Sequence, residues 1–319
     1  MIGAGYVESE LAQRHNWTKI GRYSVTNELF LDLVFTDKCN CSCPFCISRT
    51  KEYAKDDFAK WKDSFKQTLD IFDIKNLIIL GGESTVDERF FERLEFIHSV
   101  IKHKKINNVI LTTNGIRLKD KKTLQSIIDS DINAVNISYM NYDKAKNDRI
   151  FGNNTLTREE IREIYSELKR HAVNMRLNTN VYKGNLDSLS EMDSFVKYFK
   201  GCCDVIKFSP LMRTDMFDTA PEITEYTRRV ALDSETVKAL YESFEQEHEL
   251  LNKKDGILGF VRYSEVAAFE QKVTLKYEQV EDKYDPDTEI PTLKLYNNGN
   301  LSNTWDYKKN ILTDGITFA

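Results

Sequence analysis

The sequence has no long uninterrupted apolar run, and its first residues carry no basic region followed by an apolar stretch. A membrane-spanning helix needs about 20 consecutive apolar residues, and a secretory signal needs a basic start before its apolar segment. We therefore expect a chain without either feature, located in the cytoplasm. That compartment keeps thiols reduced.

Charge of one sign is not concentrated either. The formal net charge is −5, and basic residues are scattered among acidic ones, so we expect no nucleic-acid-binding surface. Hydrophobic residues make up 41% of the 319 residues. That share excludes a disordered chain, and the length is sufficient for a sizeable core.

Cysteine is scarce, and its distribution is uneven. Of the six cysteines, four lie within residues 39–46 and two are adjacent, Cys202 and Cys203. A disulfide framework is typical of short secreted chains, which this is not. A zinc site normally has four ligands in two pairs, and adjacent cysteines make an awkward pair. A structural zinc loop therefore stays only as an alternative.

Within that loop, Cys39, Cys43 and Cys46 follow the spacing C-x3-C-x2-C, with Phe45 just before the last cysteine. Three thiolates on one short loop can hold three irons of a [4Fe-4S] cluster. The fourth iron then has no protein ligand and can bind a small molecule. Cys41 offers other triplets, but we expect it not to be a ligand, because the x3-x2 spacing with the aromatic is the specific one.

Apolar, β-rich runs alternate with amphipathic helices along most of the chain. The predicted strands span residues 29–35, 76–80, 108–115, 134–140, 175–183 and 204–212. Such alternation gives a parallel sheet with right-handed crossovers and outer helices, and six units fall short of a closed eight-stranded barrel. We expect an α/β fold: an N-terminal extension at 1–27, then a partial (β/α)6 barrel at 28–213.

The candidate motifs all follow predicted strands. The cysteines come after the first strand, Gly81-Gly82-Glu83 after the second, and Thr113-Asn114-Gly115 after the third. Ligands bind at the carboxyl ends of parallel strands in folds of this kind. The agreement between motif and topology favours one functional site at that end of the barrel.

The order CNCSCPFC, GGEST, TTNG, NISYM and RLNTNVYKGN, over residues 28–213, resembles the radical S-adenosylmethionine (SAM) superfamily. Within that superfamily it is similar to the branch that includes the GTP 3′,8-cyclase and peptide-modifying maturases. The resemblance implies a [4Fe-4S] cluster whose open iron is chelated by SAM. An electron, from a donor such as flavodoxin or ferredoxin, then cleaves SAM to a 5′-deoxyadenosyl radical that abstracts hydrogen from a substrate.

The resemblance also implies a SAM site, for which an ordinary strand-to-helix turn and polar residues satisfied within the sheet are the alternatives. It assigns the methionyl ammonium to Gly81, Gly82 and Glu83. Ser138, Asn178 and Asn180 would meet the SAM carboxylate and ribose, and Arg176 could pair with the carboxylate. The complete set of candidate cofactor contacts comprises Phe45, Gly81, Gly82, Glu83, Asn114, Ser138, Arg176 and Asn178.

Residues 214–319 form a C-terminal extension that differs from the cyclases. Its predicted parts are, in order, a loop or linker over the barrel mouth at 214–232, a helix at 234–251 and a small β-rich cap at 257–319. The cap should contain a strand at 273–280 and a hairpin turn at Asn298-Gly299. We expect this cap to close the barrel and contact substrate.

Three residues are candidates for the reaction itself. A thiol such as Cys203 can return a hydrogen atom to a substrate radical, as in some radical SAM epimerases. Cys202 and Cys203 nevertheless precede the sixth strand, far from the expected chemistry, and a buried free cysteine behaves as a small apolar residue. Lys207 and Arg213 lie on or after that strand and are better placed to meet a substrate.

The sequence therefore predicts a radical SAM enzyme, an oxidoreductase, transferase or lyase, with a small nucleotide- or sugar-like substrate or a peptide. No cysteine follows Cys203, so we expect one cluster and not the cyclase reaction, which uses a C-terminal auxiliary cluster. A maturase or epimerase of a ribosomally made peptide is the first alternative. A non-catalytic iron–sulfur protein or a zinc-loop protein is the alternative from another class.

Overall fold

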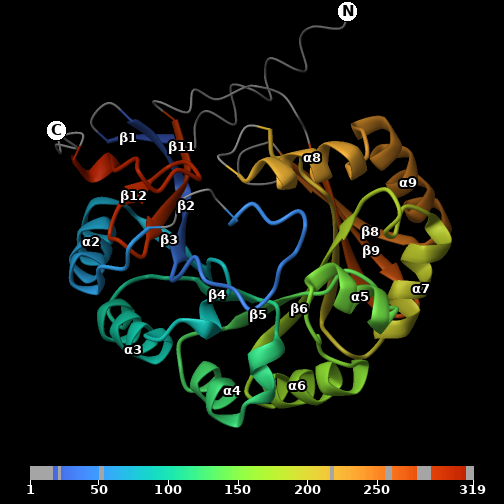
Figure 1. The fold of residues 1–319 in the computed structure, drawn as a ribbon, viewed down its shortest axis with the longest axis horizontal. Helices are drawn as coiled ribbons and strands as arrows, with labels where there is room; N and C mark the ends of the chain where they lie inside the picture. Colours follow the sequence, from blue (N-terminus) through green and yellow to red (C-terminus); the bar gives the residue numbers. More distant parts are fainter. Residues whose placement is uncertain are drawn as a thin grey trace, which may run out of the picture.

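The computed structural model describes residues 17–20, 23–49, 54–215, 219–255, 261–278 and 289–313. Its strands form a curved sheet with helices around the outside, arranged as an open ring (Figure 1). Six parallel strands, β2 to β7, lie side by side in sequence order, which confirms the expected partial barrel. Their bounds are Tyr23–Val34, Ile74–Leu80, Asn108–Thr113, Ala134–Ser138, Asn174–Val181 and Val205–Pro210.

Each parallel strand turns one face to the helices and the other to the interior of the ring, because side chains alternate along a strand. On β2, Leu31 and Leu33 belong to the apolar core, whereas Asp32 lies on the opposite face. On β6, Leu177 is in the core, and Arg176 and Asn178 flank it. Polar side chains therefore collect inside the ring.

Helices connect these strands and cover the outer face of the sheet (Figure 1). Their packing follows apolar residues at helical spacing, as with Trp61, Phe65 and Leu69 of the first of them. The helices up to β7 are α2 (Phe58–Ile71), η1 (Ser84–Val86), α3 (Phe90–Ile101), η2 (Ile116–Lys119), α4 (Lys121–Ile128), α5 (Lys144–Phe151), α6 (Arg158–Arg170) and α7 (Leu189–Phe199).

The C-terminal strands extend the sheet at both edges. β10 (Gln271–Glu278) runs parallel to β7, and β11 (Glu289–Tyr296) runs parallel to β2. The expected β-rich C-terminal part is therefore present, and its strands join the barrel sheet itself. The antiparallel additions are β9 (Val261–Ala268) beside β10, β8 (Glu249–Asp255) beside β9, β12 (Leu301–Ser302) beside β11, and β1 (Trp17–Ile20) beside β2.

The predicted hairpin is confirmed, because β11 and β12 pair across Asn298-Gly299. The loop expected at 214–232 is wrong in part, since α8 (Pro221–Val230) lies within it. Proline is tolerated in its first turn, where the missing N–H has no partner to lose. Only Ile223 and Thr227 of α8 are buried, so its apolar stripe is too thin to reveal the helical period.

The helix expected at 234–251 is α9 (Ser234–Glu247), which gives way to β8 at Glu249. The end of the predicted strand 273–280 and parts of the expected cap lie outside the described residues. Over the ranges described, none of the helices combines the length and the apolar character that a membrane crossing needs.

Candidate active site

The cysteine loop, residues 36–49, leaves the carboxyl end of β2 and crosses the middle of the ring (blue in Figure 1). Cys39 is exposed, and Cys41, Cys43 and Cys46 are half-buried. Their soft thiolates suit iron–sulfur ligation, in which each thiolate binds a different iron. Within the described ranges, no three His, Cys, Asp or Glu side chains converge as a single-ion site.

Gly81 and Gly82, which follow β3, lie against the backbone at the start of this loop. The Gly82 N–H donates to the Thr36 carbonyl at 2.7 Å. A Cβ at Gly81, whose φ is +151°, would lie 2.4 Å from that same oxygen, and one at Gly82 would lie 2.3 Å from the Lys38 carbonyl. Such separations are far below van der Waals contact, so only residues without side chains allow this approach.

The Glu83 side chain connects the ends of β3 and β4 by hydrogen bonds. Its side chain is 2% exposed, and its Oε1 accepts hydrogen bonds from the Thr85 and Thr113 hydroxyls, each at 2.6 Å. Its Oε2 accepts from the Asn114 N–H at 2.6 Å, and the Thr85 N–H adds a longer bond to Oε1. Three of these four donors meet Oε1 and one meets Oε2, so the protein itself engages most of the roughly four lone-pair sites of the carboxylate.

Asn114 connects the end of β4 to the cysteine loop. Its Nδ2 donates to the Asn40 Oδ1 at 2.7 Å and lies 3.4 Å from the Cys41 sulfur. The Cys41 N–H in turn donates to the Cys39 sulfur at 3.3 Å. Hydrogen bonding by Cys41 lowers the pKa of the Cys39 thiol to about 7, whereas burial raises the pKa of the Cys43 thiol.

The opposite side of the cysteine loop rests on the end of α5. The Ser42 N–H donates to the Phe151 carbonyl at 2.8 Å. A Cβ at Gly152 would lie 2.1 Å from the Ser42 hydroxyl oxygen. Phe45 packs against Tyr182 at the end of β6, with ring centroids 5.8 Å apart. The loop is therefore held from both sides of the barrel mouth.

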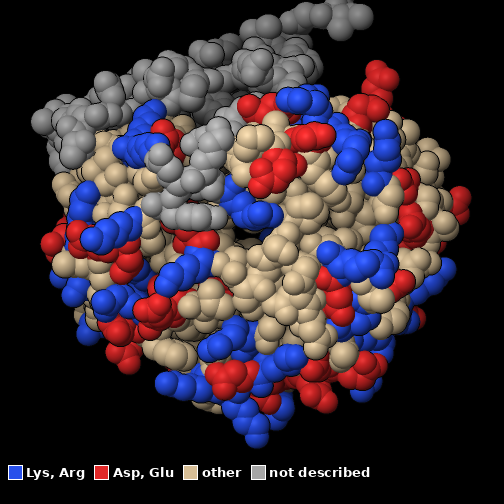
Figure 2. Space-filling view, viewed as in Figure 1, with Lys and Arg blue, Asp and Glu red and all other residues tan. Residues whose placement is uncertain are grey.

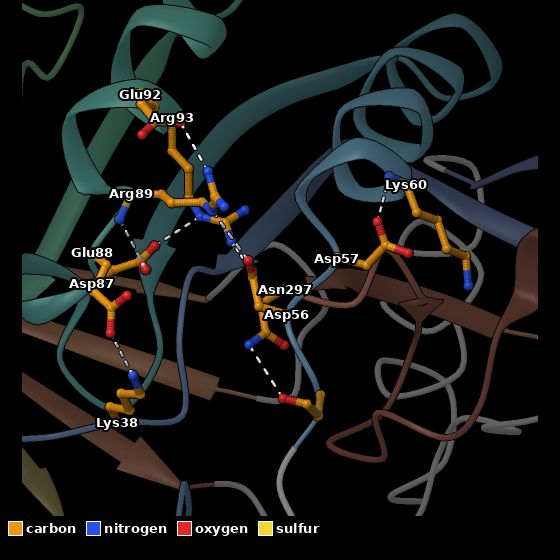
Figure 3. Close-up of polar contacts among 11 residues, drawn as sticks. Lys38, Asp56, Asp57, Lys60, Asp87, Glu88, Arg89, Glu92, Arg93 and Asn297 are labelled. Carbon is orange, nitrogen blue, oxygen red and sulfur yellow. Dashed lines mark hydrogen bonds and ion pairs between the residues drawn. The ribbon is translucent and has the colours of Figure 1, made fainter.

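A second network fixes the chain just after the cysteine loop (Figure 3). The fully buried guanidinium of Arg93, on α3, donates to Asp87 at 2.8 Å and also to Asp56. The Asp57 N–H donates to the Asn297 carbonyl in the β11–β12 turn at 3.0 Å. Lys38 pairs with Glu88 at 2.8 Å. The loop's flanks are thus tied to α3 and to the C-terminal strands.

Ser138, Asn178 and Lys207 form one row across β5, β6 and β7 in the strand register. Arg176 lies two residues before Asn178 on β6, and its Nε donates to the Asn178 Oδ1 at 2.8 Å. Burial lowers the pKa of both cations, that of Lys207 to about 7. The structure therefore brings three predicted SAM contacts together with the predicted substrate residue Lys207.

The other two candidates for the reaction lie elsewhere. Cys203 is buried before β7, at the amino end of the strands, as the sequence analysis expected. Arg213 is largely exposed, and its Nε donates to Asp215 at 2.9 Å. Asp215 also binds Arg228. The roles proposed for these two residues remain predictions without geometric support.

Sequence reasoning missed a buried ion pair inside the ring. The Lys294 ammonium, on β11, lies 3.6 Å from the Asp32 carboxylate on β2 and over the Trp305 ring, 4.8 Å from its centroid. Both members of the pair are less than 10% exposed. A single charge within each of two apolar runs, LFLDLVF and TLKLY, was the available signal, because such charges are rarely buried without a partner.

Comparisons with known proteins identify the family of this barrel. The Radical SAM superfamily pattern matches residues 33–197, just over half of the chain. A GTP 3′,8-cyclase of Aquifex aeolicus is 24% identical over 190 residues, covering 57% of this chain and 56% of that protein. A probable GTP 3′,8-cyclase of Methanosarcina mazei is 27% identical over 217 residues, covering 65% and 59%. The chain thus spans little more than half the length of these relatives.

Solved structures share the fold. Streptococcus suis SuiB bound to S-adenosylmethionine aligns with a TM-score of 0.62 and 14% identity, over 97% of this chain and 68% of that one. The structure of native anSMEcpe with bound AdoMet aligns with a TM-score of 0.51 and 18% identity, over 69% of this chain and 60% of that one. Because the superfamily pattern matches just over half of it, this chain belongs to the radical SAM superfamily of enzymes.

Proposed function

We propose that Cys39, Cys43 and Cys46 bind one [4Fe-4S] cluster and that the adjoining strand ends bind SAM. The observation that carries this proposal is the seating of the three-cysteine loop on Gly81-Gly82, across the barrel interior. When bound, the cluster and SAM together supply a 5′-deoxyadenosyl radical that abstracts hydrogen from a substrate, while the protein supplies position and shelter.

In this proposal some residues of the chain hold the cysteine loop in position and others contact SAM. Glu83, Thr113 and Asn114 fix the strand ends and, through Asn40, the cysteine loop. Ser138, Asn178 and Arg176 face the interior where the SAM carboxylate and ribose would lie. Because these groups are held before any ligand arrives, little reorganisation is needed to orient SAM. A flavodoxin or ferredoxin is the proposed electron donor.

The proposed substrate is a small molecule or a peptide. The cyclase relatives act on GTP according to their name, and one SuiB structure contains a precursor peptide. Residues 204–319 contain no cysteine, so this stretch offers no thiolate for an auxiliary cluster. The peptide alternative, a maturase or epimerase, is favoured only by the fold shared with SuiB, and the C-terminal strands would form part of the substrate site.

The test is anaerobic reconstitution of the full chain with iron and sulfide, followed by SAM and a reductant. We expect about four irons per chain, a reduced-cluster electron paramagnetic resonance signal that changes when SAM is added, and formation of 5′-deoxyadenosine. A cluster that forms but never cleaves SAM would indicate the non-catalytic iron–sulfur alternative. Zinc retained at the cysteines in place of iron would indicate the zinc-loop alternative.

A further inference from the structure

Asn185 is a fully buried asparagine that follows the carboxyl end of β6, as the last residue of the segment RLNTNVYKGN. Its Nδ2 donates to the Met140 carbonyl at 2.9 Å and to the Asn180 carbonyl at 3.0 Å. Its Oδ1 accepts a hydrogen bond from the Asn141 Nδ2 at 2.9 Å. Both amide hydrogens of Asn185 are therefore used within the protein.

The two carbonyls that Asn185 binds lie just beyond the proposed SAM contacts of β5 and β6. The register of paired residues on these strands ends at Ser138 and Asn178. Met140 comes two residues after Ser138, and Asn180 comes two residues after Asn178. The Asn185 amide therefore continues the connection between the two strands past their last paired residues.

The backbone of Asn185 turns the chain toward the cysteine loop. Its N–H donates to the Tyr182 carbonyl at 2.7 Å, and its carbonyl accepts from the Tyr182 N–H at 3.0 Å. Tyr182 is buried and packs against Phe45 of the cysteine loop. The residue after Asn185, Leu186, is fully buried and has a φ of +56°, which is unfavourable for a residue with a side chain. Such a conformation persists only where the surrounding contacts impose it, so the turn has one arrangement.

Asn185 belongs to a network of three buried asparagines, Asn141, Asn147 and Asn185, which we name the amide cluster. The Oδ1 of Asn147, on α5, accepts from the Met140 N–H at 2.8 Å and from the Asn141 N–H at 3.1 Å. Its Nδ2 donates to the Thr155 hydroxyl at 2.8 Å. A buried polar network with its amides bonded favours one arrangement, because any other leaves buried polar groups unpaired.

The amide cluster carries no charge. In the space-filling view a small hollow opens near the centre of the molecular face, and uncharged residues form much of the surface beside it (Figure 2). Because a side-chain amide is neutral, the amide cluster can fix the ends of β5 and β6 without adding a net charge to the proposed SAM site.

We propose that Asn185 is a positioning residue for SAM. It acts through Ser138 and Asn178 at the strand ends, and through Tyr182, whose ring contacts the cysteine loop. This inference rests on the proposed function, because it assumes that these strand ends contact SAM. Loss of the Asn185 amide should change how SAM is held beside the cluster, while the three thiolates still bind iron.

The first experiment compares Asn185→Ala with Asn76→Ala in the reconstituted full-length protein. Asn76 is the matched control, because it is also buried but lies near the amino end of β3, where its Oδ1 accepts from the Asn108 Nδ2 at 2.7 Å. Both variants should bind iron as wild type does. Asn185→Ala should bind SAM roughly tenfold more weakly, as expected for the loss of about one hydrogen bond to SAM, and Asn76→Ala within about twofold of wild type.

The electron paramagnetic resonance signal of the reduced cluster is a readout that a purely structural residue would not change. Saturating SAM should alter this signal in the same way in wild type and in Asn76→Ala. In Asn185→Ala the signal at saturating SAM should differ from both, because SAM is held differently beside a cluster that is still assembled.

A double-mutant cycle on SAM affinity tests whether Asn185 acts through Asn178. The effects of two substitutions add when the residues are independent, and they fail to add when one residue acts through the other. The loss of SAM affinity caused by Asn185→Ala should therefore be smaller, by roughly threefold or more, when residue 178 is already alanine. The corresponding cycle of Asn76→Ala with Asn178→Ala should be additive.

Wild-type SAM affinity and a wild-type signal in Asn185→Ala would overturn the inference, and so would full additivity with Asn178→Ala. If Asn185→Ala does not fold, Asn185→Asp replaces it in each comparison. That variant has nearly the same shape and keeps an acceptor for Asn141, but a carboxyl group can donate at most one hydrogen bond in place of two. Wild type that binds a cluster but no SAM would remove the proposed function, whereas unchanged SAM binding in the variants would remove only the role of Asn185.

Discussion

At the scale of single residues, the four cysteines of one loop differ in their surroundings. Cys43 and Cys46 are half-buried, Cys39 is exposed, and Cys41 sits between Asn114 and Cys39, with its N–H on the Cys39 sulfur. The spacing of the sequence selects Cys39, Cys43 and Cys46 as ligands. In the structure Cys41 contacts Asn114 and Cys39. We therefore expect Cys41 to position the ligand Cys39 and not to bind iron itself.

Alanine substitutions should separate these roles. Cys39→Ala, Cys43→Ala and Cys46→Ala should each lose most of the bound iron, because three thiolates are the minimum that holds the cluster. Cys41→Ala should keep it. Iron per chain and the visible absorption of the anaerobic protein measure this. If Cys41→Ala lost the cluster while Cys39→Ala kept it, the ligand assignment would be wrong.

Glu83 poses a different question, since its carboxylate already accepts hydrogen bonds from Thr85, Thr113 and Asn114. Glu83→Ala leaves these buried donors without an acceptor, at a cost of about 1–3 kcal/mol each at most. We expect a lower melting temperature of the apoprotein and SAM binding weakened roughly tenfold to a hundredfold. Unchanged stability with weakened SAM binding would indicate a direct contact of Glu83 with SAM instead of a brace.

At the scale of elements, the parallel strands were predictable because each is a short run, either mostly apolar or with apolar residues at alternate positions, between turn signals. The cysteine and glycine motifs could be assigned to strand ends because they follow these runs directly. The partners of Glu83 could not be predicted, since one glutamate next to two glycines does not reveal which donors surround it. α8 was missed because Ile223 and Thr227 alone give no apolar stripe.

The contact between the β3 end and the cysteine loop predicts the effect of Gly82→Ala. A Cβ there would meet the Lys38 carbonyl at 2.3 Å, so the loop must shift, and cluster incorporation should fall severalfold. Gly201→Ala is the control. Its φ of +73° makes alanine strained, by about 1–2 kcal/mol, but nothing lies within 4 Å of the new methyl group.

The measurement compares the iron bound per folded chain in the Gly82→Ala and Gly201→Ala variants. Gly201→Ala should lower stability and keep full iron, whereas Gly82→Ala should lose iron even where it is folded. Equal iron in both variants would mean that the glycine pair does not seat the loop.

At the scale of the whole molecule, the C-terminal strands extend the open barrel sheet at both edges. β10 and β11 were predictable as strands, but their partners were not, because β11 pairs with β2 from across more than 250 residues of sequence. β11 covers the edge of the strand that carries the cysteine loop. An exposed strand edge invites association with other chains, so removal of residues 289–319 should reduce solubility before it reveals any role in substrate binding.

Substitutions in the buried Asp32–Lys294 ion pair test the contact between β2 and β11 without removing either strand. Removing one partner leaves an uncompensated buried charge, which costs about 3–5 kcal/mol, whereas replacing both by apolar residues of similar size is often close to neutral. Asp32→Leu and Lys294→Met should therefore each destabilise the apoprotein strongly, and the double variant should recover most of the loss. Denaturant unfolding measures this coupling.

Lys254→Met is a suitable control for that cycle, since its ion pair with Glu265 is half-exposed and exposed pairs contribute about 0–1 kcal/mol. The reason to expect recovery in the double variant is that Lys294 lies over Trp305 and Asp32 lies between apolar neighbours, so the surroundings can accept apolar side chains. If the double variant were as unstable as the sum of the singles, the two charges would not be coupled. The pairing of β2 with β11 would then depend on the backbone hydrogen bonds and the apolar core, with no contribution from the charge pair.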